Sequence, residues 1–197
     1  MKKVIGIMGS PRKEGNTAKI LRNISDKAPD GIQMETVNLT EYQINCCTGC
    51  CSCQNNSNDF ICSQNDDANL LLKKIIKADA VLYATPLYGH NFSGQMKVFL
   101  DRHTSLFKFV EGKNRSVKDM KIISAIKNKP VGLIVSCQGP EENNSELIQM
   151  LFDKFCESSL SICIGKYIFP FCNTNATKSY YRKENFDTIW QDILHSL

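Results

Sequence analysis

The sequence predicts an α/β fold in which helices cover both faces of a parallel sheet of five strands. Short apolar runs alternate along the chain with segments whose apolar residues recur at helical spacing. Such alternation implies parallel strands joined by right-handed crossovers, and therefore a three-layer, doubly wound sandwich. A chain of 197 residues, without internal repeats, suits one domain spanning 1–197.

The predicted elements follow one another with little chain between them. Each strand is a short run rich in Val, Ile, Leu or Tyr, and each helix has one apolar stripe. The predicted strands are residues 2–9, 32–39, 80–86, 130–137 and 162–169. The predicted helices are residues 16–28, 66–79, 93–107, 144–159 and 184–197. Two acidic residues open the second helix, where they complement its dipole.

The segment 107–129 departs from this alternation and is interpreted as a basic insertion. It carries seven Lys or Arg residues against two acidic ones. Apolar residues at 117, 120, 123 and 126 predict one short helix within it. A solvated loop with that helix is the ordinary interpretation, because charged runs usually face water. A lid or dimer arm over a ligand is the alternative.

Composition and charge exclude several classes of protein. The net charge of +4 is too small for a nucleic-acid-binding face, and no basic helix or aromatic platform is present. No stretch approaches the ~18 apolar residues of a membrane span, and no amphipathic anchor is evident. The N-terminal apolar run is too short for a signal peptide. We therefore expect a cytoplasmic protein without nucleic-acid or membrane partners.

The turn after the first strand, "GSPRKEGNT", predicts an anion site. It matches neither the dinucleotide-binding glycine pattern nor the Walker loop. Ser10, Asn16 and Thr17 can donate hydrogen bonds, and the Arg12 guanidinium can add charge-assisted ones. Backbone N–H groups and the dipole of the following helix favour a terminal phosphate without magnesium. The alternative is that Ser10 and Asn16 only cap that helix.

A second motif, "TPLYGHNFSGQMKVFLDR", follows the third strand at residues 85–102. Together with the first motif it resembles the NADPH-dependent FMN reductase family of flavodoxin-like proteins, over roughly residues 1–165. The resemblance implies strand order 2-1-3-4-5 and FMN bound across the strand ends. Independently of it, Leu87 and Tyr88 offer apolar and aromatic surface to a flat ring, and Gly89 permits close backbone approach.

The resemblance also implies roles for individual residues. Three groups follow the first, third and fourth strands of the predicted sheet. The phosphate would be held by Ser10, Arg12, Asn16 and Thr17; the isoalloxazine ring would be lined by Pro86, Leu87, Tyr88, Gly89 and Asn91, and flanked on its other edge by Ser136 and Gly139. Bound flavin performs the chemistry, so no catalytic side chain is expected, and His90 is interpreted as a surface histidine.

The segment 45–62 is a cysteine-rich loop after the second strand. Two residues separate Cys47 from Cys50 and Cys50 from Cys53, and eight residues separate Cys53 from Cys62. This spacing is typical of a [4Fe–4S] cluster, and it resembles the iron–sulfur flavoproteins, a subset of the family, although the last spacer is longer than usual. Free or redox-active thiols, zinc and a disulfide remain alternatives.

Three functions follow from these patterns. The first is an oxidoreductase that passes electrons from NAD(P)H through FMN to a small acceptor. The second is an iron–sulfur flavoprotein that carries electrons between FMN, a [4Fe–4S] cluster and a ferredoxin-like partner. The third is a redox sensor or interaction module, bearing flavin or thiols, without enzymatic activity. Relatives suggest a homodimer or homotetramer, with contacts through the helix that starts at Ser93.

Overall fold

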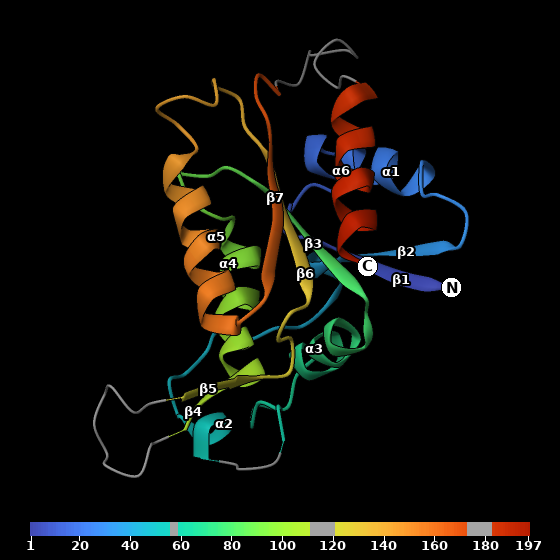
Figure 1. Cartoon of the computed structure of the whole chain (residues 1–197). Coiled ribbons are helices and arrows are strands. Elements are labelled where there is room, and N and C mark those ends of the chain that lie inside the picture. The colour runs from blue at the N-terminus through green and yellow to red at the C-terminus, as the bar shows by residue number, and fades with distance from the viewer. Residues whose placement is uncertain (56–58, 111–120, 173–182) are drawn as a thin grey trace.

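The computed structural model describes residues 1–55, 59–110, 121–172 and 183–197. Its centre is a five-stranded sheet in the order β2-β1-β3-β6-β7, in which all neighbouring strands are parallel (Figure 1). Counted within this sheet, β6 and β7 are the fourth and fifth strands. The predicted α/β class and the strand order 2-1-3-4-5 are therefore confirmed.

The five strands agree with the predicted segments to within one residue at each end. Their bounds are β1 Lys2–Met8, β2 Ile32–Asn38, β3 Ala80–Pro86, β6 Pro130–Ser136 and β7 Ile162–Phe169. The central strands β3 and β6 are buried at every position, as expected for parallel strands covered on both faces. The outer strand β2 is mostly half-buried or exposed.

Five helices match the predicted ones, and three short helical turns were not predicted. The five are α1 Asn16–Asp26, α3 Ala68–Lys77, α4 Gly94–Arg102, α5 Glu146–Ser159 and α6 Lys183–Ser196. The short ones are η1 Leu39–Glu41, α2 Ser52–Asn55 and η2 His103–Leu106. None of the helices described is long and apolar enough to cross a lipid bilayer.

The predicted helix 93–107 is too long, because α4 ends at Arg102 and tightens into η2. The hydroxyl of Thr104 donates to the Asp101 carbonyl at 2.9 Å, and that of Ser105 donates to the Arg102 carbonyl at 3.0 Å. Such local bonds from Ser and Thr compete with the α-helical pattern. Helical spacing alone does not reveal this competition.

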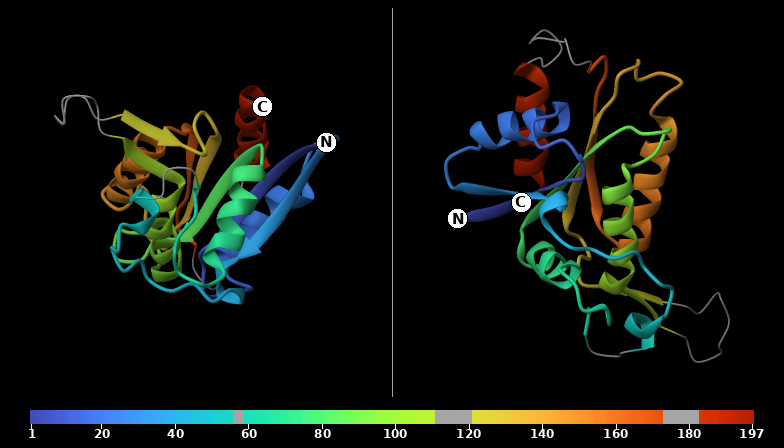
Figure 2. Two further views of the ribbon diagram at one scale, coloured as in Figure 1. Left: turned by 90° about the horizontal axis from the view of Figure 1, so that it is seen from below. Right: turned by 180° about the vertical axis from the view of Figure 1, so that it is seen from behind.

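The sheet separates two hydrophobic cores. One core packs α3, α4 and α5 against one face of the sheet, and the other packs α1 and α6 against the opposite face. Figures 1 and 2 show these two helical layers on either side of the strands. The apolar stripe predicted for α1 is the buried one, since Ala18, Leu21 and Ile24 all face its core.

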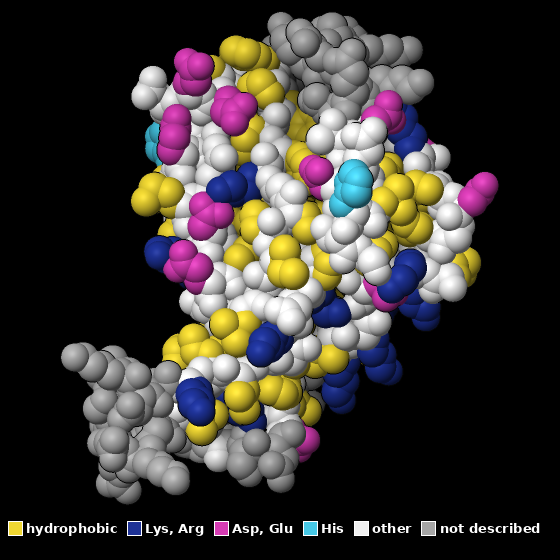
Figure 3. All heavy atoms as spheres, in the orientation of Figure 1, with side chains coloured by type: hydrophobic (Ala, Val, Ile, Leu, Met, Phe, Trp, Pro, Cys, Tyr) yellow, Lys and Arg dark blue, Asp and Glu magenta, His cyan; other side chains and the backbone are white. Residues whose placement is uncertain are grey.

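The basic insertion contains an antiparallel hairpin where a short helix was expected. Strand β4, Phe107–Val110, pairs with β5, Lys121–Ser124. The predicted helix is wrong at Ile123, which lies in β5, while residues 117 and 120 lie outside the described residues. Figure 3 shows hydrophobic and basic side chains together over this hairpin. Phe109, Val110 and Ile123 are more than 40% exposed there.

One histidine is buried in the core between the sheet and α5. The Nε2 atom of His103 accepts a hydrogen bond from the Tyr83 hydroxyl at 3.0 Å, while Nδ1–H donates to the Phe99 carbonyl at 2.9 Å. Aromatic rings of Phe99 and Phe155 pack edge-on against it. Burial lowers the pKa of His103 from 6.5 to about 4, although the bond to Phe99 opposes the change. The ring is therefore neutral in the folded protein.

His103 predicts that the protein loses stability in mild acid. Between pH 6.5 and 4 the unfolded chain binds a proton that the folded chain excludes, so the free energy of unfolding falls as the pH falls. The limiting loss is ~1.4 kcal/mol per pH unit, or about 3 kcal/mol over this window. Urea unfolding at several pH values should show a shallower decline for His103→Gln than for the exposed-site control His195→Gln. Equal declines would contradict the assignment.

Candidate functional site

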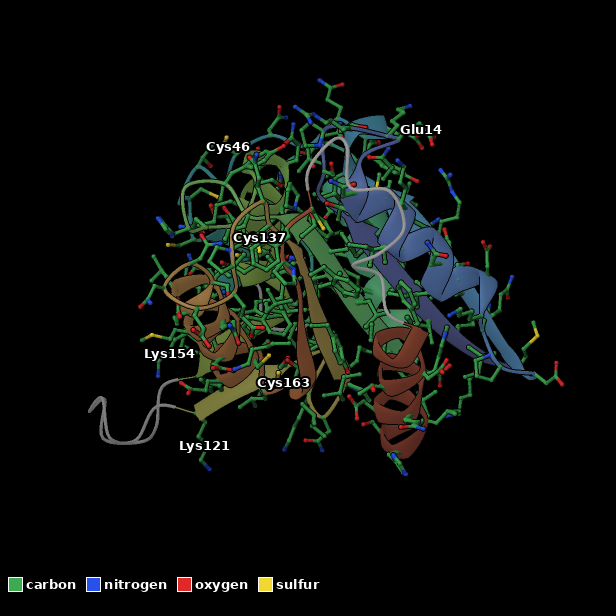
Figure 4. All side chains as sticks on the ribbon, turned by 90° about the horizontal axis from the view of Figure 1, so that it is seen from above. Glu14, Cys46, Lys121, Cys137, Lys154 and Cys163 are labelled. Carbon is green, nitrogen blue, oxygen red and sulfur yellow. The ribbon has the colours of Figure 1, made fainter. Side chains whose placement is uncertain are left out.

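A cavity of about 240 Å³ opens at the carboxyl ends of three neighbouring strands. The parallel register aligns these ends, because Met8 pairs with Ala84 and Pro86 pairs with Ser136. Open α/β sheets bind ligands at this edge. The lining residues are Ser10, Arg12, Gly15, Asn16, Thr17, Pro86, Leu87, Tyr88, Ser136, Cys137, Gln138 and Cys172. Viewed from above in Figure 4, Cys137 lies near the middle of the molecule.

The loop after β1 is held against α4 by Gly9. Its N–H donates to the Ala84 carbonyl at 2.8 Å, and its carbonyl accepts a 2.5 Å bond from the Ser93 hydroxyl. A Cβ atom at this position would lie 2.6 Å from the Cβ of Met96. Glycine is therefore required here for close approach of the loop to the helix, which fixes where the following residues enter the cavity.

The N-terminus of α1 faces the cavity without a side-chain cap. Its N-cap is Gly15, no side chain among the described residues caps the helix there, and the first turn contains no acidic residue. The alternative role predicted for Ser10 and Asn16 is therefore wrong. Ser10 Oγ instead accepts the Arg12 N–H at 3.2 Å, and the Asn16 amide donates to the Cys172 carbonyl at 3.1 Å. Uncapped N–H groups and the helix dipole together favour a bound anion.

Hydrogen bonds join the three segments that form the cavity. The hydroxyls of Thr17 and Ser136 lie 2.7 Å apart, which ties the start of α1 to the end of β6. The Leu87 N–H donates to the Ser136 carbonyl at 2.9 Å and continues the β3–β6 pairing beyond Pro86. Tyr88 is 46% exposed and therefore presents its ring at the cavity edge. The walls are thus positioned before any ligand arrives.

The next turn explains why a glycine follows Tyr88. Gly89 and His90 have φ angles of +54° and +60°, and the N–H of each flanking residue, Tyr88 and Asn91, donates to the carbonyl of the other. Two successive positive φ angles are accessible to glycine without strain and are uncommon for histidine. His90 is exposed, and its Nδ1 lies 3.0 Å from the Asn144 carbonyl. That contact holds the turn against the loop after β6.

The cavity gathers most of the predicted flavin-site residues, but not all of them. Eight of the eleven line it: Ser10, Arg12, Asn16, Thr17, Pro86, Leu87, Tyr88 and Ser136. Gly89, Asn91 and Gly139 do not line the cavity and belong to the turns beside it. Gly15 and Cys172 were not predicted, whereas Cys137 and Gln138 lie between Ser136 and Gly139 in the loop that was predicted to flank the ring. Cys172 follows β7, so the strand-end argument applied to the fifth strand would have found it.

Two cysteines bring thiols to the cavity wall. The Cys172 N–H donates to the Cys137 carbonyl at 2.8 Å, which extends the pairing of β6 and β7. Burial raises the pKa of Cys137 to about 11, with smaller contributions from the charges of Cys172 and Glu141. The Cys137 thiol is therefore protonated at neutral pH and is a poor nucleophile.

Three of the four cysteines predicted as metal ligands lie within electrostatic range of the fourth, Cys53. Burial raises the pKa of Cys53; a hydrogen bond from Gln54 opposes this, and the charges of Cys62, Cys47 and Cys50 raise it further. Cys62 therefore lies near Cys53, although eight residues separate the two in the sequence. Cys47 and Cys50 are exposed, whereas Cys53 and Cys62 are half-buried. The loop therefore presents one side of the group to solvent.

A buried ion pair closes the base of this loop. Arg102 Nη1 and Nη2 donate to the two carboxylate oxygens of Asp66 at 2.6 and 3.1 Å, and their side chains are 0% and 1% exposed. Nη1 also donates to the Asn45 carbonyl at 2.9 Å, and Asp66 accepts the Asn45 N–H at 2.9 Å. Burial acts to raise the pKa of Asp66, but bonds from Arg102 and from backbone N–H groups outweigh it and lower the pKa.

Two amide side chains hold the rest of the loop. Asn69 on α3 accepts the Cys62 N–H and donates to the Cys62 carbonyl, both at 2.9 Å. Gln54 on α2 donates to the carbonyls of Thr104 and Phe107 at 2.8 and 2.9 Å. Figure 1 accordingly shows α2 beside the hairpin β4–β5. Both ends and the middle of the loop are therefore anchored to the rest of the protein.

The alternatives for the cysteines differ in how well the structure supports them. All ten cysteines are within the described residues and carry free thiols. Among the described side chains, no three His, Cys, Asp or Glu residues are grouped closely enough to bind one metal ion. That arrangement does not favour zinc, whose ligands surround a single ion. Each thiolate of a [4Fe–4S] cluster binds a different iron atom, so its four sulfurs need not be as close.

The sheet order and the cavity at its carboxyl edge define a flavodoxin-like protein whose first strand-to-helix turn borders that cavity. The chain belongs to the NADPH-dependent FMN reductase family, whose model matches residues 2–176. An azoreductase from Bacillus anthracis has the same fold, with a TM-score of 0.66 at 12% identity over 100% of this chain and 97% of that one.

Two iron–sulfur flavoproteins are among the similar sequences. One from Methanosarcina thermophila is 32% identical over 153 residues, which is 77% of this chain and 71% of that protein. One from Archaeoglobus fulgidus is 40% identical over 101 residues, which is 51% of this chain and 44% of that protein. The chain spans about half the length of several curated relatives that it matches, with 44%, 53% and 48% covered.

The contact between Gly9 and α4 predicts the effect of adding one methyl group. Gly9→Ala should lower the free energy of unfolding by about 1–3 kcal/mol, because the new Cβ overlaps Met96 and forces the loop or helix to shift. Gly94→Ala is the matched control, since a Cβ there meets no atom within 4 Å and should stabilise α4 by about 0.5–1 kcal/mol. Urea denaturation measures both. A Gly9→Ala protein as stable as wild type would refute the packing argument.

Proposed function

We propose that this chain is an FMN-dependent oxidoreductase that takes electrons from NAD(P)H and also holds a [4Fe–4S] cluster on its cysteine loop. The observation that carries the proposal is the cavity in which residues after β1, β3 and β6 meet at the uncapped N-terminus of α1. Membership of the FMN reductase family supports it. We place both sites in one domain of residues 1–197.

The donor set at the cavity suits the phosphate of FMN. The first-turn N–H groups of α1 and the hydroxyls of Ser10 and Thr17 would bind its oxygens, and Arg12 would neutralise its charge. Asn16 holds the loop by its bond to the chain after β7. Neither a divalent cation nor an acidic side chain is needed for such binding.

The other wall suits a flat aromatic ring. Pro86 and Leu87 would cover one side of the ring, and Tyr88 would shield it from water at the cavity edge. Bound FMN would supply hydride acceptance from the nicotinamide and release of electrons one or two at a time. The protein contributes binding, orientation and exclusion of water, and the protonated Cys137 thiol adds an uncharged wall.

The cysteine loop could bind a [4Fe–4S] cluster through four of its thiols. Cys47, Cys50, Cys53 and Cys62 would be its ligands, and the similarity to iron–sulfur flavoproteins supports this assignment. A bound cluster would supply one-electron storage. The anchored ends of the loop would reduce the conformational freedom lost when a cluster binds. The acceptor would then be a small molecule or a ferredoxin-like protein, and the assembly a homodimer or homotetramer.

Removal of the Arg12 charge should weaken FMN binding without unfolding the protein. Arg12 is exposed at the cavity, and charged hydrogen bonds contribute about 1.5–3 kcal/mol, so Arg12→Gln should raise the Kd for FMN by ~10- to 100-fold. Fluorescence quenching of FMN by apoprotein measures the Kd. The control is Arg22→Gln, which removes an exposed arginine on α1 that pairs with Glu14 outside the cavity. Equal Kd values for both variants would contradict the phosphate site.

Single serine substitutions should separate cluster ligands from their neighbours. Protein purified anaerobically should contain about four iron atoms and four sulfides per chain if all four ligands are correct. Cys47→Ser, Cys50→Ser, Cys53→Ser and Cys62→Ser should each lose most of that iron. Cys46→Ser and Cys51→Ser are matched controls from the same loop and should retain it. Loss of iron in the controls but not at Cys62 would reassign the fourth ligand.

A second candidate function is an electron carrier that uses no nicotinamide. The four cysteines of the loop favour it, because a one-electron centre bound there could exchange electrons directly with a protein partner. Rapid anaerobic mixing with NADH and NADPH distinguishes the two candidates. Bleaching of the flavin absorbance supports the oxidoreductase. Absence of bleaching, together with reduction by a reduced ferredoxin, supports the carrier.

A further inference from the structure

One buried hydrogen-bond donor beside the cysteine loop, on the side chain of Arg102, takes no part in the contacts described so far. Arg102 is fully buried, and both of its terminal nitrogens bind Asp66, one of them also binding the Asn45 carbonyl. Its third donor, Nε–H, is buried and has no hydrogen-bond partner among the described residues. An unpaired buried donor costs free energy, so it is rarely left without a use.

Cys62 is the predicted ligand whose side chain influences the Arg102 guanidinium. Asn69 fixes the Cys62 backbone through bonds to both its N–H and its carbonyl. Burial acts to lower the pKa of Arg102, but Asp66 and then the side chain of Cys62 outweigh this effect and raise it. Arg102 therefore bonds Asp66 and Asn45, on the two sides of the cysteine segment, and its charge is near enough to Cys62 for that side chain to raise the pKa of Arg102.

We propose that Arg102 is a positioning residue for the iron–sulfur site: its Nε–H donates a hydrogen bond to the Cys62 sulfur, sets Cys62 as the fourth ligand and raises the reduction potential of the cluster. This inference rests on the proposed cluster. Reduction adds one electron, and hence one negative charge, to a group held by four thiolates. A donated hydrogen bond and a nearby positive charge stabilise that added charge.

Asp66 gives the inference a second, opposite consequence. Its carboxylate partly cancels the charge of Arg102 at the same place. Loss of the Arg102 charge should therefore lower the potential, while loss of the Asp66 charge should raise it. A merely structural role for the ion pair predicts no such difference in sign, since both changes break the same pair.

Redox titration of anaerobically purified protein tests this directly. Arg102→Gln should lower the equilibrium constant for one-electron reduction of the cluster at least tenfold, which is about 59 mV. Arg102→Lys keeps the charge but loses the planar set of N–H donors, so it should lower this equilibrium constant less. Asp66→Asn should raise the equilibrium constant. Lys97→Gln is the matched control, because it removes an exposed charge from the same helix. A potential for Arg102→Gln equal to that of wild type would overturn the inference.

A measurement on the wild-type chain covers the case in which these variants fail to fold. Protein labelled with ¹⁵N-arginine and reduced with dithionite should show a nitrogen coupling to the paramagnetic cluster in pulsed EPR, and the coupling should disappear in Arg102→Lys. No coupling in wild type, or a coupling that survives in Arg102→Lys, would overturn the inference. Wild-type protein without iron and sulfide would instead refute the proposed cluster itself, so the two failures are distinguishable.

Discussion

The parallel pairing of β1, β3 and β6 is the constraint on which the candidate site depends. Because these strands point the same way, the chain leaves all three at one edge of the sheet, and residues far apart in sequence meet there. The bond between Thr17 and Ser136 and the packing of Gly9 on α4 hold together the segments that follow these three strands. No single segment forms the cavity, so its chemistry exists only in the assembled fold.

The cysteine loop is organised on a different principle. It leaves the sheet after β2 and is held by side chains rather than by strand pairing, with the pair of Arg102 and Asp66 at its base. Such a pair stabilises less than its Coulomb energy suggests, because both groups lose their hydration on burial. Its geometric effect is clearer: Arg102 comes from α4, Asp66 precedes α3, and their bonds to Asn45 join the two ends of the loop.

Sequence reasoning predicted the sheet almost completely, because buried parallel strands are continuous apolar runs that few other structures imitate. It also predicted the cavity, since strand ends locate it. It did not predict that β4 and β5 form a hairpin: Ile123 and its neighbours fit a helical period as well as a strand, and the contact of Gln54 with Phe107 is tertiary. Nor did it find the burial of Arg102, because charged residues are normally exposed and only packing reveals the exception.

The closed base of the cysteine loop bears on how such a loop can evolve. Since its two ends are fixed to each other, residues can be inserted between Cys53 and Cys62 without moving any strand, at an entropic cost that grows only with the logarithm of length, about 0.6 kcal/mol for each doubling. The eight-residue spacer is then a tolerated length variant. Changes among the exposed residues of the loop would then leave the cavity at the strand ends unchanged.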